Sequence, residues 1–282
     1  MIVDSNHSRY VKPYMGELVN WCHPLARGLG YWWSFNEQTG VPMSLRESIF
    51  SKQIPQAYQA DGAGTWVAGG MRVNDGGLKG PRLFGCNWTT SASLAIQVTI
   101  ESVTGAAPAL VSKRNASGAT GWNFQTNAGN VVMAYGSSVF LTFTGADPGL
   151  GEHMFVVTYQ ASDTALEWHL YVDGFLAGTL NDARVPPLVA DSVYVNLGVR
   201  WPGDTTYMTG IVHMLGFWVD NALTSGDARE LWHNPYSIFE FPEVVPAVMA
   251  AIDWPEDETP LSHTSAAVLG AVRGSVRSRE ER

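Results

Sequence analysis

Apolar and polar residues alternate with a period of two along much of the chain. From Leu94 to Ile100 every second residue is apolar, which is typical of a β-strand with one buried face. The same alternation predicts strands in three more segments, 155–159, 166–172 and 193–199. Further strands are predicted at 30–35, 66–73, 109–113, 122–126, 131–135, 139–144 and 211–219. Clusters of Gly, Pro, Asn and Asp separate many of these segments, so the pattern indicates strands joined by short turns.

One turn and one helix have local signals of their own. Asp173-Gly174 stands between two apolar runs and supplies the two positive-φ positions that a type I′ hairpin turn requires. Thr224 with Asp227 three residues later predicts a helix start, and Asn234-Pro235 predicts its end. Neither βαβ spacing nor an internal repeat is visible. The pattern therefore predicts an all-β sandwich with one short helix.

The composition agrees with one globular β domain and excludes two classes of partner. Hydrophobic residues make up 45% of the 282 residues, and 29 Gly with 11 Trp suit strands that are joined by tight turns. The net charge is −9 and no dense Lys/Arg stripe occurs, so no nucleic-acid partner is expected. No apolar run reaches 18 residues, so no membrane partner is expected. The first 20 residues also lack the continuous apolar core of a secretory signal.

Both ends of the chain differ in composition from the middle. Residues 240–258 contain six acidic residues and three prolines without a Lys or Arg, and residues 262–282 contain four arginines. Such segments are typical of extended arms that become ordered on a partner. The predicted organisation is an N-terminal arm at 1–24, a sandwich at 25–239 and an acidic, Pro-rich, then Arg-containing C-terminal arm at 240–282.

Several segments carry a resemblance to a known family. They are Gly28–Glu37, Trp88–Ile96, His153–Tyr159, Leu170–Thr179 and Gly210–Thr224. In this order they resemble the laminin G-like branch of the concanavalin A-like lectin/glucanase superfamily. The resemblance implies a jelly-roll β-sandwich over about residues 28–234.

The end of the predicted sandwich resembles a narrower group. Leu231–Phe239 is similar to the helix and Asn-Pro-aromatic-x-x-Phe ending of laminin G-like proteins encoded by tailed bacteriophages. This resemblance implies a virion protein that assembles in the host cytoplasm. Two departures from the family, Val212-His213-Met214 in place of an acidic pair and Met43–Gln59 in place of an Asn/Gly-rich segment, argue against its calcium site. No cofactor is expected.

Catalytic and metal-binding motifs are missing from the sequence. Retaining glucanases of the superfamily place carboxylates in a Glu-x-Asp-x-x-Glu pattern, and a retaining pair stands about 5 Å apart. The nearest acids here, Glu167 and Asp173, would lie roughly 20 Å apart on an extended strand. The seven histidines show no metal-ligand spacing, and Cys22 and Cys86 are expected to be buried thiols. We therefore expect no enzymatic activity and no metal.

Loop aromatics supply the candidates for a glycan site. Trp201 and Tyr207 bracket a turn-rich segment in which a ring could stack on a sugar while Asp204 accepts hydrogen bonds from its hydroxyls. Trp122 with Asn123 is a second candidate pair, because it follows the loop at 115–121. For both sets the favoured alternative is an ordinary role as loop anchors.

Together these observations favour a non-enzymatic bacteriophage virion structural protein. The most specific version of this hypothesis is a capsid decoration or cement protein that displays a lectin-like sandwich on the particle surface. The two arms would bind the major capsid protein or other virion proteins, and self-association as a trimer would suit a capsid lattice. The alternative is a glycan-binding module of a tail or fibre for host adsorption. A glycosidase is the third reading and requires acids that converge from separate strands.

Overall fold

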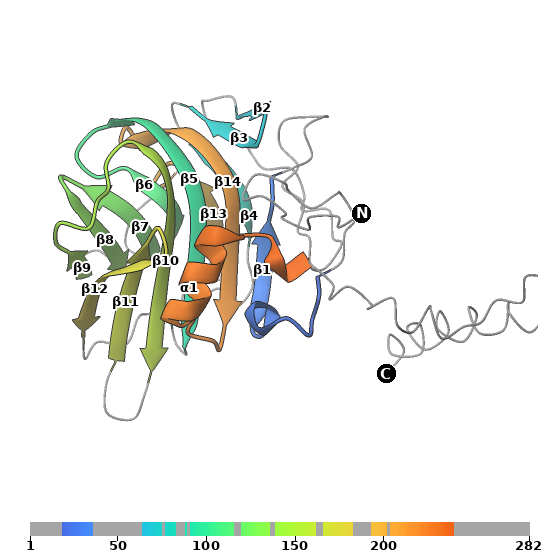
Figure 1. Cartoon of the computed structure of the whole chain (residues 1–282). Coiled ribbons are helices and arrows are strands. Elements are labelled where there is room, and N and C mark those ends of the chain that lie inside the picture. Colours follow the sequence, from blue (N-terminus) through green and yellow to red (C-terminus); the bar gives the residue numbers. More distant parts are fainter. Residues whose placement is uncertain are drawn as a thin grey trace, which may run out of the picture. The chain divides into compact units, whose positions relative to one another are not determined.

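Two antiparallel β-sheets face each other in the computed structural model (Figure 1). The structure describes residues 19–35, 64–74, 77–82, 88, 91–115, 120–135, 139–161, 166–182, 193–201 and 204–239. All of these residues belong to one unit, Met1–Phe241. The predicted C-terminal arm, the segment Met43–Gln59 and Cys86 lie outside the described residues.

The larger sheet contains eight of the described strands. Its order is β12-β11-β10-β5-β14-β3-β2, and β1 pairs with β14. Its strands are β1 (Leu29–Trp33), β2 (Thr65–Val67), β3 (Gly70–Val73), β5 (Ala92–Thr104), β10 (Gly151–Ala161), β11 (Leu166–Val172), β12 (Phe175–Asn181) and β14 (Tyr207–Val219). The long strands β5, β10 and β14 form its centre, and β1 and β3 pair with different parts of β14.

The smaller sheet contains six of the described strands in the order β4-β13-β6-β7-β8-β9. Its strands are β4 (Leu78–Arg82), β6 (Ala109–Arg114), β7 (Gly121–Asn127), β8 (Asn130–Tyr135), β9 (Val139–Phe143) and β13 (Tyr194–Leu197). The two sheets confirm the prediction of an all-β jelly-roll sandwich. The segment 66–73, predicted as one strand, is instead the hairpin β2–β3, because Gly69 adopts a positive φ of 84° and turns the chain.

The main core lies between the sheets and is rich in aromatic rings. Trp88, Trp122 and Trp168 are almost completely buried there, and the ring centroid of Trp88 lies 5.8 Å from that of Trp122 and 5.1 Å from that of Trp168. From β5, Leu94, Ile96 and Val98 enter the same core. The alternation that predicts β5 therefore marks its core face correctly.

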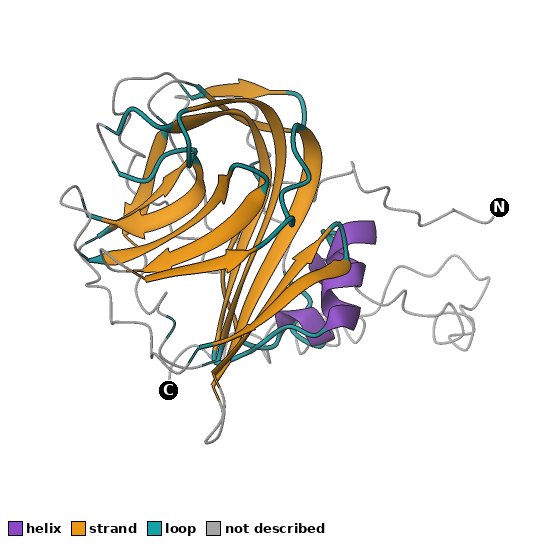
Figure 2. Cartoon of the chain, turned by 90° about the vertical axis from the view of Figure 1, so that its left-hand side faces the viewer, coloured by secondary structure: helices purple, strands orange, loops and turns teal. Residues whose placement is uncertain are grey.

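A second core covers the outer face of the larger sheet. Three short helical segments lie against this face, η1 (Pro24–Ala26), α1 (Ser225–His233) and η2 (Ser237–Phe239), as Figure 2 shows. Trp32 and Trp218 lie at its centre with perpendicular rings, 6.1 Å between centroids. Burial in this layer raises the pKa of the Tyr236 phenol, with a further contribution from Glu152. Ala95, on the polar side of the predicted β5 pattern, is buried because this layer covers it.

The predicted helix and hairpin turn are both present. Thr224 and Asp227 form a capping box, in which Asp227 N donates to Thr224 Oγ1 at 3.2 Å and Thr224 N donates to Asp227 Oδ2 at 2.7 Å. At the turn between β11 and β12, Asp173 and Gly174 have φ of 52° and 79°. Both local predictions are therefore confirmed. None of the described helices is long and apolar enough to cross a membrane.

Residues 19–24 belong to the domain, so the predicted inner boundary of the N-terminal arm is wrong. Asn20 N donates to Ile238 O at 2.7 Å, and Val19 packs in the second core. His23 caps η1 and its Nε2 lies 3.1 Å from Glu230 Oε1. Cys22 is an exposed free thiol rather than a buried one, because it lies in the turn before η1.

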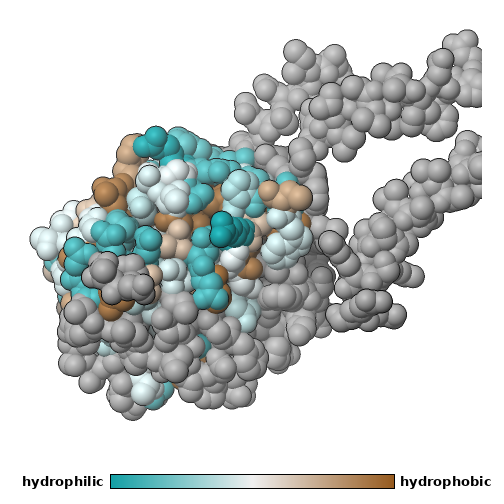
Figure 3. All heavy atoms as spheres, turned by 90° about the horizontal axis from the view of Figure 1, so that it is seen from below, coloured by the Kyte–Doolittle hydropathy of each residue, from teal (hydrophilic) through white to brown (hydrophobic). Residues whose placement is uncertain are grey.

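Large apolar side chains reach the surface of the described part at a few places. On the face drawn in Figure 3, hydrophobic residues form small patches separated by polar ones. The large hydrophobic residues that are exposed within the described ranges are Trp21, Val103, Phe140, Leu150, Phe175 and Leu176. Val103 lies near the end of β5 and Leu150 lies in the connection between β9 and β10, and both border the same pocket.

Candidate functional site

The loop between β13 and β14 brings together the residues of the first predicted glycan site. Val199 pairs with Tyr207, and Met208 N donates to Gly198 O at 2.8 Å, so the loop is closed by backbone hydrogen bonds at its base. Asp204 N donates to Trp201 O at 3.1 Å. Tyr207 is half-buried at the start of β14.

The Asp204 carboxylate accepts hydrogen bonds from groups of its own loop. It accepts two hydrogen bonds from Arg200, Nε to Oδ2 at 2.6 Å and Nη2 to Oδ1 at 3.0 Å. Its Oδ1 also accepts from Thr206 N at 3.2 Å, and the side chain is only 5% exposed. The carboxylate therefore holds the loop in shape, and its oxygens are already used as hydrogen-bond acceptors.

Trp201 is in contact with two cations. The Arg200 Cζ lies 4.6 Å from the centroid of its ring, and the Arg114 Cζ lies 5.4 Å from it. Burial lowers the pKa of Arg114, the nearby Arg200 lowers it further, and Asp204 opposes the shift. The half-buried ring packs against these two guanidinium groups.

The second predicted pair, Trp122 with Asn123, is wrong as a glycan site because both residues are buried. Trp122 is 2% exposed and its ring contacts Trp88 and Phe217 in the main core. Asn123 is completely buried; its Oδ1 accepts from Arg114 Nη1 at 2.8 Å, and its Nδ2 donates to Gln125 Oε1. Neither side chain is available to a ligand.

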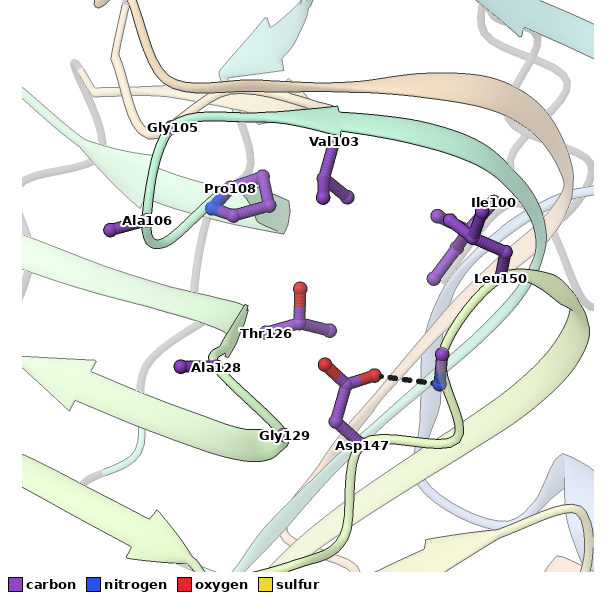
Figure 4. Close-up of a pocket in the computed structure, with 11 residues that line it drawn as sticks. Ile100, Val103, Gly105, Ala106, Pro108, Thr126, Ala128, Gly129, Asp147 and Leu150 are labelled. Atoms are coloured by element: carbon purple, nitrogen blue, oxygen red, sulfur yellow. Dashed lines mark hydrogen bonds between the residues drawn. The ribbon is translucent and has the colours of Figure 1, made fainter.

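A pocket of about 410 Å³, which the sequence did not reveal, opens at one end of the sandwich (Figure 4). Three connections form its rim, those between β5 and β6, β7 and β8, and β9 and β10. The lining residues are Ile100, Val103, Gly105, Ala106, Pro108, Thr126, Ala128, Gly129, Asp147, Gly149 and Leu150. Ile100 is buried in the main core, whereas Val103 and Leu150 are 46% and 63% exposed. The pocket thus runs from the surface to the core between the sheets.

Two polar side chains point into this apolar space. Figure 4 shows the carboxylate of Asp147 and the hydroxyl of Thr126 directed toward the middle of the pocket. Asp147 Oδ1 accepts from Gly149 N at 3.0 Å, and Asp147 N donates to Gly129 O at 3.3 Å. These bonds orient the carboxylate. Within the described ranges, Asp147 is the single ionisable residue that lines the pocket.

The described lining residues can contact a small ligand, but they do not supply the pair of carboxylates that most glycosidases use. Such a pair flanks the scissile bond, and here one carboxylate faces the pocket. Glu167 and Asp173 lie at opposite ends of β11, and Asp173 accepts from Met154 N at 2.9 Å and lies 2.9 Å from His153 Nδ1. Within the described ranges, no three His, Cys, Asp or Glu side chains are placed to hold a metal ion.

Comparisons with known proteins give the fold class. No protein-family model matches the chain, and no curated protein resembles it in sequence. Domain 4 of AbnA, a GH43 extracellular arabinanase from Geobacillus stearothermophilus solved in complex with arabinotriose, is 18% identical with a TM-score of 0.53 over 72% of this chain and 97% of that chain. Trypanosoma rangeli sialidase is 16% identical with a TM-score of 0.51 over 75% of this chain and 33% of that chain.

At these identities the likeness shows the fold alone. The chain spans about a third of the length of the sialidase and nearly all of the arabinanase domain. It therefore has a β-sandwich fold that also occurs in carbohydrate-active proteins.

Proposed function

We propose that the chain is a non-catalytic glycan-binding module and that the pocket at the open end of the sandwich is its binding site. The observation that carries this proposal is the combination of aliphatic walls with one carboxylate and one hydroxyl that face the same space. A sugar ring presents C–H faces and hydroxyl groups, which match these two kinds of surface. The volume of about 410 Å³ lies in the usual range of small-molecule pockets, about 300–1,000 Å³.

Two further points support a binding role. The AbnA domain of the same fold is described in complex with arabinotriose, a short neutral oligosaccharide. The described part of the lining has one carboxylate, which suits recognition of hydroxyl groups. It does not contain the second acid of the usual hydrolytic mechanisms.

Asp147→Ala is expected to weaken oligosaccharide binding about 10- to 100-fold, because hydrogen bonds to a charged acceptor contribute roughly 1.5–3 kcal/mol. Isothermal titration calorimetry against a panel of oligosaccharides measures the change. Trp201→Ala is the matched comparison, because it tests the site that the sequence predicted. The proposal is wrong if Trp201→Ala abolishes binding while Asp147→Ala leaves it unchanged.

We propose in addition that this module is a structural component of a bacteriophage virion, as a capsid decoration or cement protein. The supporting observation is the 2.7 Å hydrogen bond between Asn20 N and Ile238 O, which makes the two boundaries of the described domain neighbours. Residues 1–18 and 240–282 thus join the domain at adjacent points, and both can bind one partner such as the major capsid protein. The pocket opens between the sheets, away from the helical layer on the outer face, so attachment and glycan binding are compatible.

Deleting residues 240–282 is expected to abolish incorporation into particles while the midpoint of thermal unfolding of the sandwich stays nearly unchanged. Quantitative mass spectrometry of purified particles, with the major shell protein as the copy-number standard, measures incorporation. A copy number comparable to that of the shell protein supports decoration, and a much smaller one supports the alternative of a tail or fibre module. Full incorporation of the truncated chain contradicts the role of this arm.

A further inference from the structure

We infer that the pocket selects uncharged sugars and excludes acidic ones, such as sugars that carry a carboxylate. This inference rests on the proposed glycan-binding function and specifies its ligand class. It depends on three properties of the pocket: the charge of its lining, the direction of the Asp147 carboxylate, and the absence of a cation among the lining residues that the structure describes.

The charge of the lining is negative and is not compensated within it. Of the eleven described lining residues, ten are Gly, Ala, Pro, Thr or aliphatic, and the eleventh is Asp147. Sugar carboxylates are usually held by Arg or Lys, and neither occurs among these described residues. Asp147 is half-buried beside apolar neighbours, so solvent screens its charge only in part. An acidic ligand in this pocket would meet a like charge without a counter-ion.

The hydrogen-bonding chemistry also favours an uncharged sugar over an acidic one. Gly149 N donates to Asp147 Oδ1 at 3.0 Å, and Figure 4 shows the other carboxylate oxygen on the side that faces Thr126. This oxygen is an acceptor, so a ligand must bring a donor to it. A sugar hydroxyl is such a donor, whereas a sugar carboxylate can only accept.

The nearest charge on β5 does not alter this conclusion. Glu101 follows the lining residue Ile100, but its carboxylate is bound by the Arg72 guanidinium on the other face of the strand. The pair is exposed to solvent, with side chains 32% and 35% exposed, so it is well screened. The likeness to the sialidase shows the fold alone, so it does not predict the ligand of this pocket.

The test uses pairs of oligosaccharides that differ only in one group, a C6 hydroxymethyl in the neutral member and a C6 carboxylate in the acidic one. Wild-type protein is expected to bind the neutral member at least about tenfold more tightly, because like-charge contacts at a binding surface are strongly unfavourable. Asp147→Asn keeps the shape and the acceptor for Gly149 N but removes the charge. This variant is expected to reduce the preference to about threefold or less.

Glu101→Gln is the matched control, because it removes one negative charge from the exposed pair with Arg72 instead of from the pocket. It is expected to leave the preference unchanged. Raising the salt concentration is expected to reduce the preference of the wild-type protein, because salt screens charge repulsion and leaves neutral contacts unaffected.

The outcomes separate the two proposals. Equal or tighter binding of the acidic member by wild-type protein overturns the selectivity and leaves glycan binding established. A preference that Asp147→Asn does not reduce overturns the assignment of the selectivity to Asp147. A panel in which no sugar binds overturns the glycan-binding function and the selectivity with it.

Discussion

Trp218→Ala is expected to lower the free energy of unfolding by about 4 kcal/mol, because removal of a buried tryptophan leaves a cavity and typically costs about 3–5 kcal/mol. Trp218 is completely buried in the second core and packs edge-on against Trp32. Its Nε1 donates to Leu25 O at 2.7 Å. The substitution therefore also leaves a buried carbonyl oxygen without its donor, on the segment that precedes β1.

Urea denaturation of the full chain measures this loss of stability, and two further variants serve as comparisons. Trp218→Phe keeps a ring but removes the N–H group, so it is expected to lose less stability than Trp218→Ala. Trp21→Ala removes a tryptophan that is 59% exposed and is expected to change the stability by no more than about 0.5 kcal/mol. A loss below about 1 kcal/mol for Trp218→Ala would show that the helical layer contributes little to the stability of the sandwich.

Gly121→Ala is the second substitution with a large expected effect, a loss of about 3 kcal/mol or more. Gly121 begins β7 with φ of 115°, a conformation that residues with a Cβ rarely adopt. A Cβ at this position would also overlap the carbonyl oxygen of Lys113 on the paired strand β6. The contacted atom belongs to a paired backbone, so it cannot move aside as the end of a side chain can.

Gly145→Ala separates the effect of the positive φ from the effect of the steric overlap with the backbone. Gly145 also has a positive φ, 70°, but nothing lies within 4 Å of the place where its Cβ would be. This variant is expected to lose only about 1–2 kcal/mol, the usual cost of a left-handed conformation with a Cβ. Thermal unfolding of both variants measures the difference. Equal losses would show that backbone conformation alone, and not the contact with Lys113, makes Gly121 necessary.

The parts of the fold that could be predicted are those with a local signal. Period-two alternation marks β5, the Asp173-Gly174 pair marks the hairpin of β11 and β12, and Thr224 with Asp227 marks the start of α1. The strand β4 was missed, because its sequence, Leu78–Arg82, contains Gly and Pro and shows no alternation. Its pairing with β13 is a long-range contact that no local pattern contains.

The candidate site could be predicted less well, because its residues meet only after the sheets have formed. Ile100 lies on β5, Thr126 lies on β7 and Asp147 lies in the connection between β9 and β10, so the three residues are far apart in the sequence. Trp122 was predicted as a glycan candidate because it follows a loop, but it lies on β7 and enters the core together with Phe124. For Trp201 the sequence identifies the aromatic ring, but its contact with Arg114 depends on the folding of the loop onto β6.

The hydrogen bond between Asn20 and Ile238 also affects how the domain can be combined with other sequences. A domain whose two boundaries are neighbours can be inserted into an exposed loop of a host protein without forcing the ends of that loop apart. For the same reason a short linker between these boundaries would permit circular permutation, with new termini in a surface turn. The sandwich is thus suited to being moved between proteins as a single inserted unit.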